Sequence, residues 1–331
     1  MLRKFLIAVA MTPVVSGLVA LGLILSQWPE ADPRRAAGAE TTHEVTGDRL
    51  PPLETYRARD GAMLGYRTFQ PSDPSQDAPI VIMLHGAGGH GGWMAPLASG
   101  VAERSNAIVI APDLRGHGPT PARRGDVDYI GQLEDDVADL VGHLAPQDRE
   151  IILLGHSAGG GLTIRLAGGA HSTLVDRAVL VAPFLQHDAP TALAADPDGW
   201  ARPLVRRIAG LWMLNAVGIS LLNHLTVVEF RFPEDVLNSP ASAVATRHYS
   251  YRLQFSLSPR RDWQKDVAGL PLYLLVAGAA DTTFRADAYE PTLRPIAPHG
   301  DFVVLDGAGH ADILDDMRLV NVVSNFIAGV D

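Results

Sequence analysis

Residues 151–162 read IILLGHSAGGGL, a sequence in which an apolar run stops abruptly at a glycine. The run Ile151–Leu154 has the length and composition of a buried strand, and the pattern Gly-x-Ser-x-Gly follows it at once. Glycines beside the serine indicate a turn too tight for bulky side chains, and the small residues after it lead into a helix. We therefore predict a strained strand–turn–helix unit in which the hydroxyl of Ser157 stands clear of a sheet.

Apolar runs of similar length recur along the chain, as neighbouring strands of one sheet would require. They lie at residues 80–84, 107–111, 178–182, 272–277 and 302–305. Most are separated by segments in which apolar residues recur at helical spacing, such as residues 129–144. Buried strands that alternate with amphipathic helices predict an α/β fold, with a mainly parallel sheet covered by helices on both faces.

The same alternation sets the limits of the domain. A turn pair, Asp60-Gly61, separates two strand-like runs, and we place the α/β domain at residues 54–331. The alternation is missing over about residues 184–268. An insertion of that length between two sheet strands predicts a cap over the carboxyl edge of the sheet, where open α/β sheets carry their sites.

A serine hydroxyl is a weak nucleophile until a base accepts its proton, so we searched for a histidine and a carboxylate that orients it. Asp281 follows the apolar run 272–277, and His310 follows the run 302–305. The order Ser, Asp, His is the one that this architecture uses. We predict Ser157, Asp281 and His310 as a catalytic triad. Asp281 as a simple turn residue is the alternative, and Asp306 lies too close to His310 in sequence to replace it.

The glycine-rich stretch LHGAGGHGG, residues 84–92, permits two interpretations. As Gly86-x-Gly88-x-x-Gly91 it matches a dinucleotide fingerprint, and Asp113 lies about where that fingerprint needs a ribose-binding carboxylate. As His-Gly-x-x-Gly it matches a loop that directs a backbone N–H at an oxyanion. Only the second interpretation explains the serine turn and the late Asp and His together.

In the hydrolase interpretation this loop supplies half of an oxyanion hole. The predicted donors are the N–H groups of Ala87 and Ala158, with Gly88 in place of Ala87 if the loop is shifted by one residue. His85 is expected to hold the loop rather than act as a base. Asp113, which begins the sequence DLRGHG, is expected to organise a loop.

Composition excludes several classes of function. The formal charge of −10 argues against a nucleic-acid partner, which would require a basic face. The chain has no cysteine, so disulfides, thiolate nucleophiles and cysteine-ligated zinc are excluded. His-Glu-x-x-His is also absent from the sequence. We therefore predict no metal site.

The N-terminus has the pattern of a membrane anchor. Residues Phe5–Leu25 carry no charge and follow the basic pair Arg3-Lys4, and about 20 such residues can cross a bilayer as a helix. We predict an anchor at residues 1–25, with a cleaved signal peptide as the alternative. A short cytoplasmic N-terminus would place the catalytic domain on the extracytoplasmic side. Residues 26–53 are expected to form a flexible linker.

A second uncharged run, Ile208–Val228, lies within the predicted cap. It cannot cross a bilayer, because Ser157 and His310 would then lie on opposite sides. We interpret it as a cap helix that lines an acyl pocket, lies at a membrane surface, or simply packs against the rest of the cap. The side chains suited to an interface are Trp200, Trp212, Arg202, Arg206 and Arg207.

Five motifs in this order, LHGAGG, DLRGHG, GHSAGG, AGAAD and GAGH, resemble the α/β-hydrolase superfamily. They are most similar to its monoacylglycerol lipase and lysophospholipase-like branch, grouped with the serine aminopeptidase S33 domain. The resemblance implies a cofactor-free serine hydrolase with the triad named above. A lipid-like ester is the expected substrate. The alternatives are an aminopeptidase that binds the substrate amine through Glu229, and a non-catalytic binding protein on the same fold.

Overall fold

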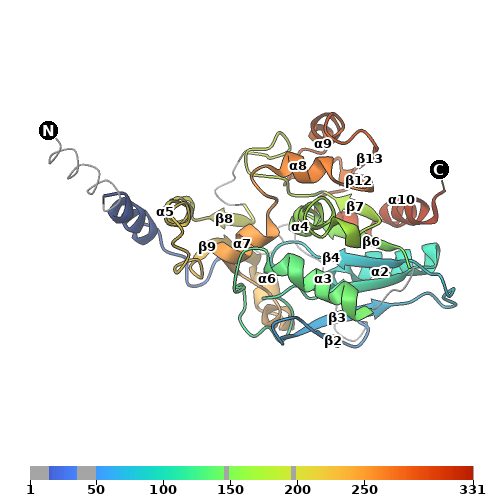
Figure 1. The fold of residues 1–331 in the computed structure, drawn as a ribbon. Helices are drawn as coiled ribbons and strands as arrows, with labels where there is room; N and C mark the ends of the chain where they lie inside the picture. Colours follow the sequence, from blue (N-terminus) through green and yellow to red (C-terminus); the bar gives the residue numbers. More distant parts are fainter. Residues whose placement is uncertain (1–14, 36–49, 145–148, 195–198, 331) are drawn as a thin grey trace.

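The computed structural model describes residues 15–35, 50–144, 149–194 and 199–330. Its largest sheet has the strand order β13-β12-β7-β6-β4-β5-β3-β2 (Figure 1). The strands are β2 (Glu54–Arg57), β3 (Met63–Phe69), β4 (Ile80–Leu84), β5 (Ile108–Pro112), β6 (Ile151–His156), β7 (Arg177–Val181), β12 (Leu272–Gly278) and β13 (Gly300–Leu305). Only the hairpin β2–β3 and its pairing with β5 are antiparallel. The prediction of a mainly parallel α/β sheet is confirmed.

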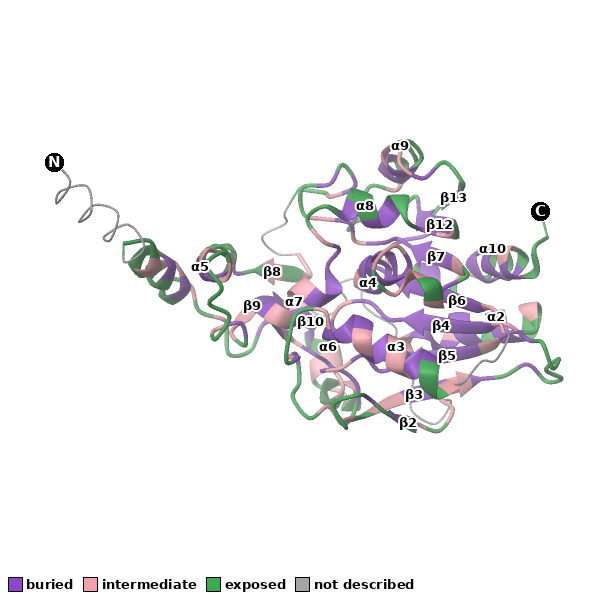
Figure 2. Ribbon diagram, in the orientation of Figure 1, coloured by how far each residue is buried: buried purple, intermediate pink, exposed green. Residues whose placement is uncertain are grey.

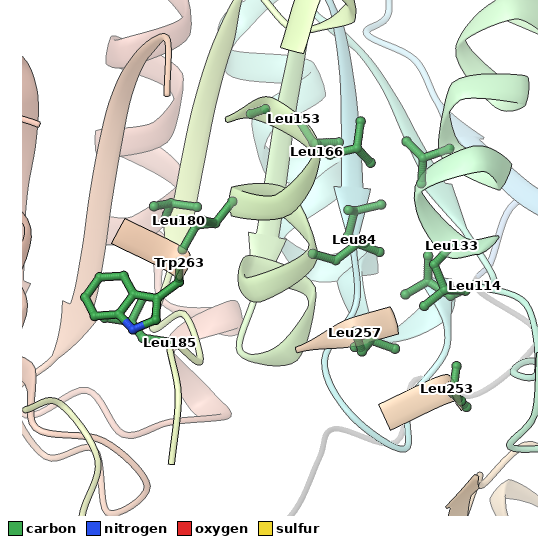
Figure 3. Packing of buried hydrophobic residues seen from close by; sticks show 14 of the residues in the cluster. Leu84, Leu114, Leu133, Leu153, Leu166, Leu180, Leu185, Leu253, Leu257 and Trp263 are labelled. Atoms are coloured by element: carbon green, nitrogen blue, oxygen red, sulfur yellow. The ribbon is translucent and has the colours of Figure 1, made fainter. Parts of the chain in front are cut away.

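Side chains of the central strands alternate between two separate cores, as a sheet covered on both faces requires. In β4, Ile80, Ile82 and Leu84 enter one core, whereas Val81 and Met83 enter the other. The first core, part of which is drawn in Figure 3, is closed by α3 (Gln132–Leu144), α4 (Ala158–Ala167), α8 (Trp263–Ala268) and α9 (Tyr289–Leu293). The second is closed by α2 (Ala95–Ser105) and α10 (Met317–Ala328).

Between β7 and β12, residues 201–257 form a layer of their own beyond the carboxyl ends of the strands, whereas α8 packs on the main sheet (Figure 1). The centre of this layer is a second, antiparallel sheet with the order β11-β9-β8. Its elements are β8 (Ala201–Pro203), α5 (Val205–Asn215), β9 (Thr226–Phe230), β10 (Phe232–Pro233), α6 (Glu234–Leu237), β11 (His248–Ser250) and α7 (Tyr251–Leu257).

We had expected the apolar run 208–228 to be a single cap helix, and the structure shows that it is not. Helix α5 ends at Asn215, Gly218 has a positive φ of 81°, and the run then continues into strand β9. The side-chain amides of Asn215 and Asn223 exchange two hydrogen bonds of 2.7 and 2.8 Å, which closes the turn. The apolar run therefore covers most of helix α5, a turn and the start of strand β9, and it does not form one continuous element.

Three of the five side chains suited to an interface instead make contacts inside the cap. Arg207 is buried, where its guanidinium donates to the carbonyl oxygens of Ile24 and Thr226. Arg202 forms an ion pair inside the cap, and the ring of Trp200 packs against Phe232 with centroids 4.6 Å apart. Of the five side chains proposed for an interface, Trp212 and Arg206 are exposed.

The N-terminal segment lies against the cap. A helix covers residues 15–25, and its Ala20 and Ile24 are buried on α5. A Cβ on Gly210 would come within 2.5 Å of the carbonyl oxygen of Ala20, so glycine permits this close helix crossing. Strand β1 (Arg34–Arg35) then pairs in parallel with β10. Residues 26–35, expected to be part of a flexible linker, therefore contact the cap.

The expected membrane anchor falls largely on residues 1–14, outside the described part of the chain. In the part that is described, no helix combines the length and the apolar character needed to cross a membrane. Both the helix at residues 15–25 and α5 have an exposed side (Figure 2). Large apolar side chains are exposed there, among them Leu18, Leu25 and Trp212.

Candidate active site

Ser157 occupies a strained turn between β6 and α4. Its φ is 53° and its ψ is −118°, a backbone conformation that residues other than glycine rarely adopt. A Cβ on Gly155 would lie 2.2 Å from the carbonyl oxygen of Gly159, and one on Gly159 would lie 2.3 Å from that of Leu84. The backbone N–H of Ser157 donates to the carbonyl of Val181 at 2.9 Å, which ties the turn to β7. Both glycines are required by the tightness of the turn.

The side chains of Ser157, His310 and Asp281 form a continuous hydrogen-bonded chain. Nε2 of His310 lies 3.0 Å from Oγ of Ser157, and its Nδ1 lies 2.8 Å from Oδ2 of Asp281. The aspartate follows β12 and the histidine follows β13, so neighbouring strands deliver both to the edge that carries the serine. The Asp281 side chain is 1% exposed and that of His310 is 14% exposed, so only the imidazole end of the pair faces outward.

The second oxygen of Asp281 is held by the backbone. Its Oδ1 accepts N–H groups from Thr283 at 2.6 Å and from Phe284 at 2.9 Å. Burial alone would raise the pKa of Asp281, but the hydrogen bond and charge of His310 together with these two N–H groups lower it below its usual value. The carboxylate is therefore ionised at neutral pH and fixed in orientation.

Two further residues, to which no sequence motif pointed, contact His310. The ring of Phe284 meets it edge to face, with centroids 5.1 Å apart. Nε2 of His156, next to the serine, lies 2.9 Å from the backbone carbonyl oxygen of His310. Both contacts join residues that are far apart in sequence, so no local sequence pattern predicts them.

The glycine loop after β4 runs directly beside the serine. A Cβ on Gly86 would lie 3.3 Å from Cβ of Ser157 and 3.1 Å from Nδ1 of His156. Residues 81–92 are buried with the exception of Ala87, and residues 151–160 are buried with the exception of Ala158. The two residues predicted as oxyanion donors are thus the ones that each segment leaves accessible.

His85 orients the peptide that carries the Ala87 N–H. The backbone N–H of Leu114 donates to Nε2 of His85 at 3.2 Å, so the ring proton is on Nδ1 and faces the Gly86 carbonyl oxygen, 2.8 Å away. That carbonyl and the Ala87 N–H belong to one trans peptide and point in opposite directions. Burial lowers the pKa of His85 to about 4, so the ring is neutral and acts as a support for the loop.

Ala158 is the first residue of α4, so its N–H has no acceptor within the helix. Gly88, the replacement that we considered for Ala87, donates its N–H to the hydroxyl oxygen of Tyr249 at 2.8 Å. This engagement leaves Ala87 as the donor expected from the glycine loop.

Asp113 braces the same loop and does not face a ligand. Its Oδ1 accepts the Gly91 N–H at 2.8 Å, and the guanidinium of Arg67 lies 3.4 Å away. Its side chain is 5% exposed, and a Cβ on Gly118 would lie 2.4 Å from Oδ2. A carboxylate enclosed in this way cannot bind a ribose, so the structure supports the interpretation of Asp113 as a loop organiser.

Glu229, expected to meet a substrate amine in the aminopeptidase alternative, is fully buried in the cap sheet. Arg202 on the adjacent strand β8 pairs with its carboxylate, and the backbone N–H of Glu30 donates to it. His248 on β11 lies 3.8 Å from the same carboxylate. The prediction for Glu229 was wrong because its partners lie on neighbouring strands and in the N-terminal segment, which no local pattern brings together.

Comparison with known proteins gives the same fold. The model of the alpha/beta hydrolase family matches residues 81–322. An uncharacterized protein of Mycobacterium tuberculosis is 26% identical over 302 residues, which are 85% of this chain and 82% of that protein.

Two solved structures share the fold at lower sequence identity. A membrane phospholipase A superposes with a TM-score of 0.60 at 19% identity, over 99% of both chains. A soluble variant of the monoglyceride lipase of Saccharomyces cerevisiae superposes with a TM-score of 0.59 at 16% identity, over 88% of this chain and 97% of the lipase. The family model covers most of the sequence and includes the serine turn, Asp281 and His310, and the chain therefore belongs to the alpha/beta hydrolase family.

Proposed function

We propose that the protein is a serine hydrolase that cleaves carboxylic esters through an acyl-enzyme on Ser157. The observation that carries the proposal is the chain of hydrogen bonds from Ser157 Oγ through His310 to Asp281, which begins at a serine held in a strained turn. An ionised aspartate at Nδ1 keeps the ring proton there, so Nε2 presents a lone pair to the hydroxyl. This is the arrangement that a serine needs in order to act as a nucleophile.

The reaction has two halves. In the first, Oγ of Ser157 attacks the ester carbonyl carbon while Nε2 of His310 accepts the hydroxyl proton. The N–H groups of Ala87 and Ala158 stabilise the negative carbonyl oxygen, and one such donor typically contributes about 3 kcal/mol to transition-state stabilisation. The C–O bond to the alcohol then breaks, and His310 returns its proton to the departing oxygen. In the second half, water attacks the acyl-enzyme by the same route and regenerates the serine.

The finer part of the proposal is a lipid-like ester, of the monoacylglycerol or lysophospholipid type, as expected for the branch grouped with the serine aminopeptidase S33 domain. Large apolar side chains are exposed on the helix at residues 15–25 and around the end of α5, with Leu18 65%, Trp212 56% and Leu221 82% exposed. Such a surface supports contact with a bilayer. We include in the proposal an anchor at residues 1–25 and an extracytoplasmic catalytic domain. No carboxylate of the cap sheet is free to bind a peptide amine in the place expected of Glu229.

The proposal is tested by comparing the wild type with Ser157→Ala on four substrates: p-nitrophenyl butyrate, a monoacylglycerol, a lysophosphatidylcholine and an aminoacyl naphthylamide. Ser105→Ala is the control, because that hydroxyl lies on α2 and donates to the Val101 carbonyl at 2.7 Å. We expect hydrolysis of the ester substrates, no cleavage of the amide, and complete loss in Ser157→Ala alone. Ester hydrolysis that survives in Ser157→Ala would overturn the mechanism. Hydrolysis restricted to the butyrate would overturn the lipid-like substrate class.

A further inference from the structure

A tyrosine of the cap reaches into the glycine loop beside the candidate active site. The hydroxyl oxygen of Tyr249, on β11, lies 2.8 Å from the backbone nitrogen of Gly88 and 2.6 Å from Nε2 of His117. Tyr249 is 1% exposed and His117 is 3% exposed. Three segments that are remote in sequence therefore meet at one buried hydroxyl: the loop after β4, the DLRGHG loop after β5, and the cap sheet.

The direction of these hydrogen bonds follows from His117. Its Nδ1 lies 3.2 Å from the carbonyl oxygen of Leu114 and 3.1 Å from that of Arg115, so Nδ1 carries the ring proton. Burial lowers the pKa of His117 well below its usual value, and the ring is neutral. Nε2 is then an acceptor and takes the Tyr249 hydroxyl proton. The lone pairs of the tyrosine oxygen are left to accept the Gly88 N–H.

Gly88 is held by the cap on both of its peptide groups. Its N–H donates to Tyr249, and its carbonyl oxygen accepts the Thr246 N–H at 3.0 Å. Its φ of 76° is a conformation that favours glycine. Since His85 fixes the peptide before Ala87 and Tyr249 fixes the peptide after it, the backbone of Ala87 is held on both sides.

Within the described residues, the hydrogen bond of the Gly88 N–H goes to the Tyr249 hydroxyl oxygen, in buried and aromatic surroundings. The Tyr249 ring packs edge to face on Phe230, with centroids 4.6 Å apart, and both side chains are buried. A Cβ on Gly88 would lie 3.1 Å from the ring atoms of Phe232 and of Trp200, so cap aromatic rings cover this part of the loop. A buried N–H that loses its acceptor in such a place is left unpaired, and the peptide is then free to turn.

We propose that Tyr249, oriented by His117, is a positioning residue that holds the Ala87 N–H in place as an oxyanion donor, so that the cap sheet completes the active site. This inference rests on the proposed function of Ser157 and Ala87. Tyr249 does not touch the reacting atoms; it acts through the Ala87–Gly88 peptide. A loosened oxyanion donor lowers transition-state binding while leaving ground-state binding of the ester largely unchanged.

The test is Tyr249→Phe, which removes one oxygen atom and keeps the ring. Full loss of one oxyanion donor costs about 10²–10³ in kcat, and a misplaced donor costs part of that, so we expect kcat to fall about 10- to 100-fold with KM within about twofold. The matched control is Tyr273→Phe, which removes another buried hydroxyl, bonded to the Ala297 carbonyl at 3.1 Å and remote from the loop. The control should keep the kcat of the wild type.

Activity is expressed per active site, titrated with a fluorophosphonate that phosphonylates Ser157 to completion with release of fluoride, so that misfolded protein is not counted. Inhibition by a trifluoromethyl ketone supplies a second measurement, because its tetrahedral adduct carries an oxyanion. Its Ki should rise by the same factor by which kcat/KM falls. A purely structural role would lower the titrated fraction and leave both quantities per site unchanged.

His117→Asn tests the other end of the chain, since it removes Nε2 and leaves Tyr249 in place. We expect kcat to fall in this variant as well. In the double variant, kcat should be about the same as in the more impaired single variant, because the two residues act as one unit. The inference would be overturned if Tyr249→Phe kept the wild-type kcat per site and the wild-type Ki for the ketone. If Tyr249→Phe does not fold, the same result in His117→Asn would overturn it. Retained ester hydrolysis in Ser157→Ala would instead overturn the proposed function.

Discussion

Asp281→Asn changes one atom and reverses the proton arrangement on which the proposed mechanism depends. In the wild type, Oδ1 accepts two backbone N–H groups and Oδ2 accepts the Nδ1 proton of His310. The asparagine oxygen must keep the two N–H groups, because an amide NH₂ placed there would face two donors. The NH₂ then faces Nδ1 of His310 and forces that nitrogen to act as an acceptor.

The ring proton of the variant therefore moves to Nε2, which faces Oγ of Ser157 and can no longer accept its proton. A triad aspartate replaced in the same way in a serine protease costs about 10⁴ in kcat. We expect a loss of about 10³- to 10⁴-fold, equivalent to about 4–5.5 kcal/mol of activation free energy. KM and the folded fraction should change little, since the two backbone hydrogen bonds are retained.

The assay is hydrolysis of p-nitrophenyl butyrate at pH 7.5, with active sites titrated as above. Asp306→Asn is the matched control: that exposed carboxylate lies on the same loop as His310 and should retain full activity. More than a tenth of the wild-type kcat in Asp281→Asn would refute the assigned tautomer. Equal losses in both variants would show that the effect is one of local charge.

Two further predictions concern stability. His85 has a folded-state pKa of about 4 because it is buried, so the unfolded chain, with an ordinary histidine pKa near 6.5, binds a proton first as the pH falls. The contribution of His85 to the free energy of unfolding is therefore lost as the pH falls from 6.5 to 4. Between pH 7 and pH 5, the free energy of unfolding measured in urea should fall by about 2 kcal/mol more in the wild type than in His85→Gln. The same pH dependence in both proteins would contradict this. Gly159→Ala places a Cβ against the Leu84 carbonyl and should lower the free energy of unfolding by about 3 kcal/mol or more. The control is Gly142→Ala, where a Cβ meets open space on α3, and it should raise the free energy of unfolding by about 0.5–1 kcal/mol. Equal urea midpoints for the two variants would refute the clash.

Local sequence patterns were sufficient to predict the strands of the main sheet. The apolar run expected at residues 80–84 is β4, and the run at 272–277 is β12 with one more residue. Such strands are buried on both faces, so their composition alone distinguishes them from loops. The positions of Ser157, Asp281 and His310 could be anticipated for a related reason. Each lies within five residues of the end of a strand, β6, β12 or β13, and parallel strands end at one edge of the sheet.

The cap could not be anticipated in the same way. Strand β9 continues the apolar composition of α5, and β1 consists of two arginines that pair with β10, so neither has a periodicity of its own. The pairing of Glu229 with Arg202, and that of Tyr249 with Gly88, depend on contacts between distant segments. Sequence patterning reports burial and local conformation, whereas these contacts follow from how the cap sheet is placed on the domain.

The most direct measurement is to locate the covalent adduct of a fluorophosphonate by intact-protein and peptide mass spectrometry. The account predicts one adduct per chain, on the peptide that contains Ser157, formed rapidly in the wild type and absent from Ser157→Ala. An adduct on a different residue, or undiminished ester hydrolysis by a protein that forms no adduct at Ser157, would contradict it.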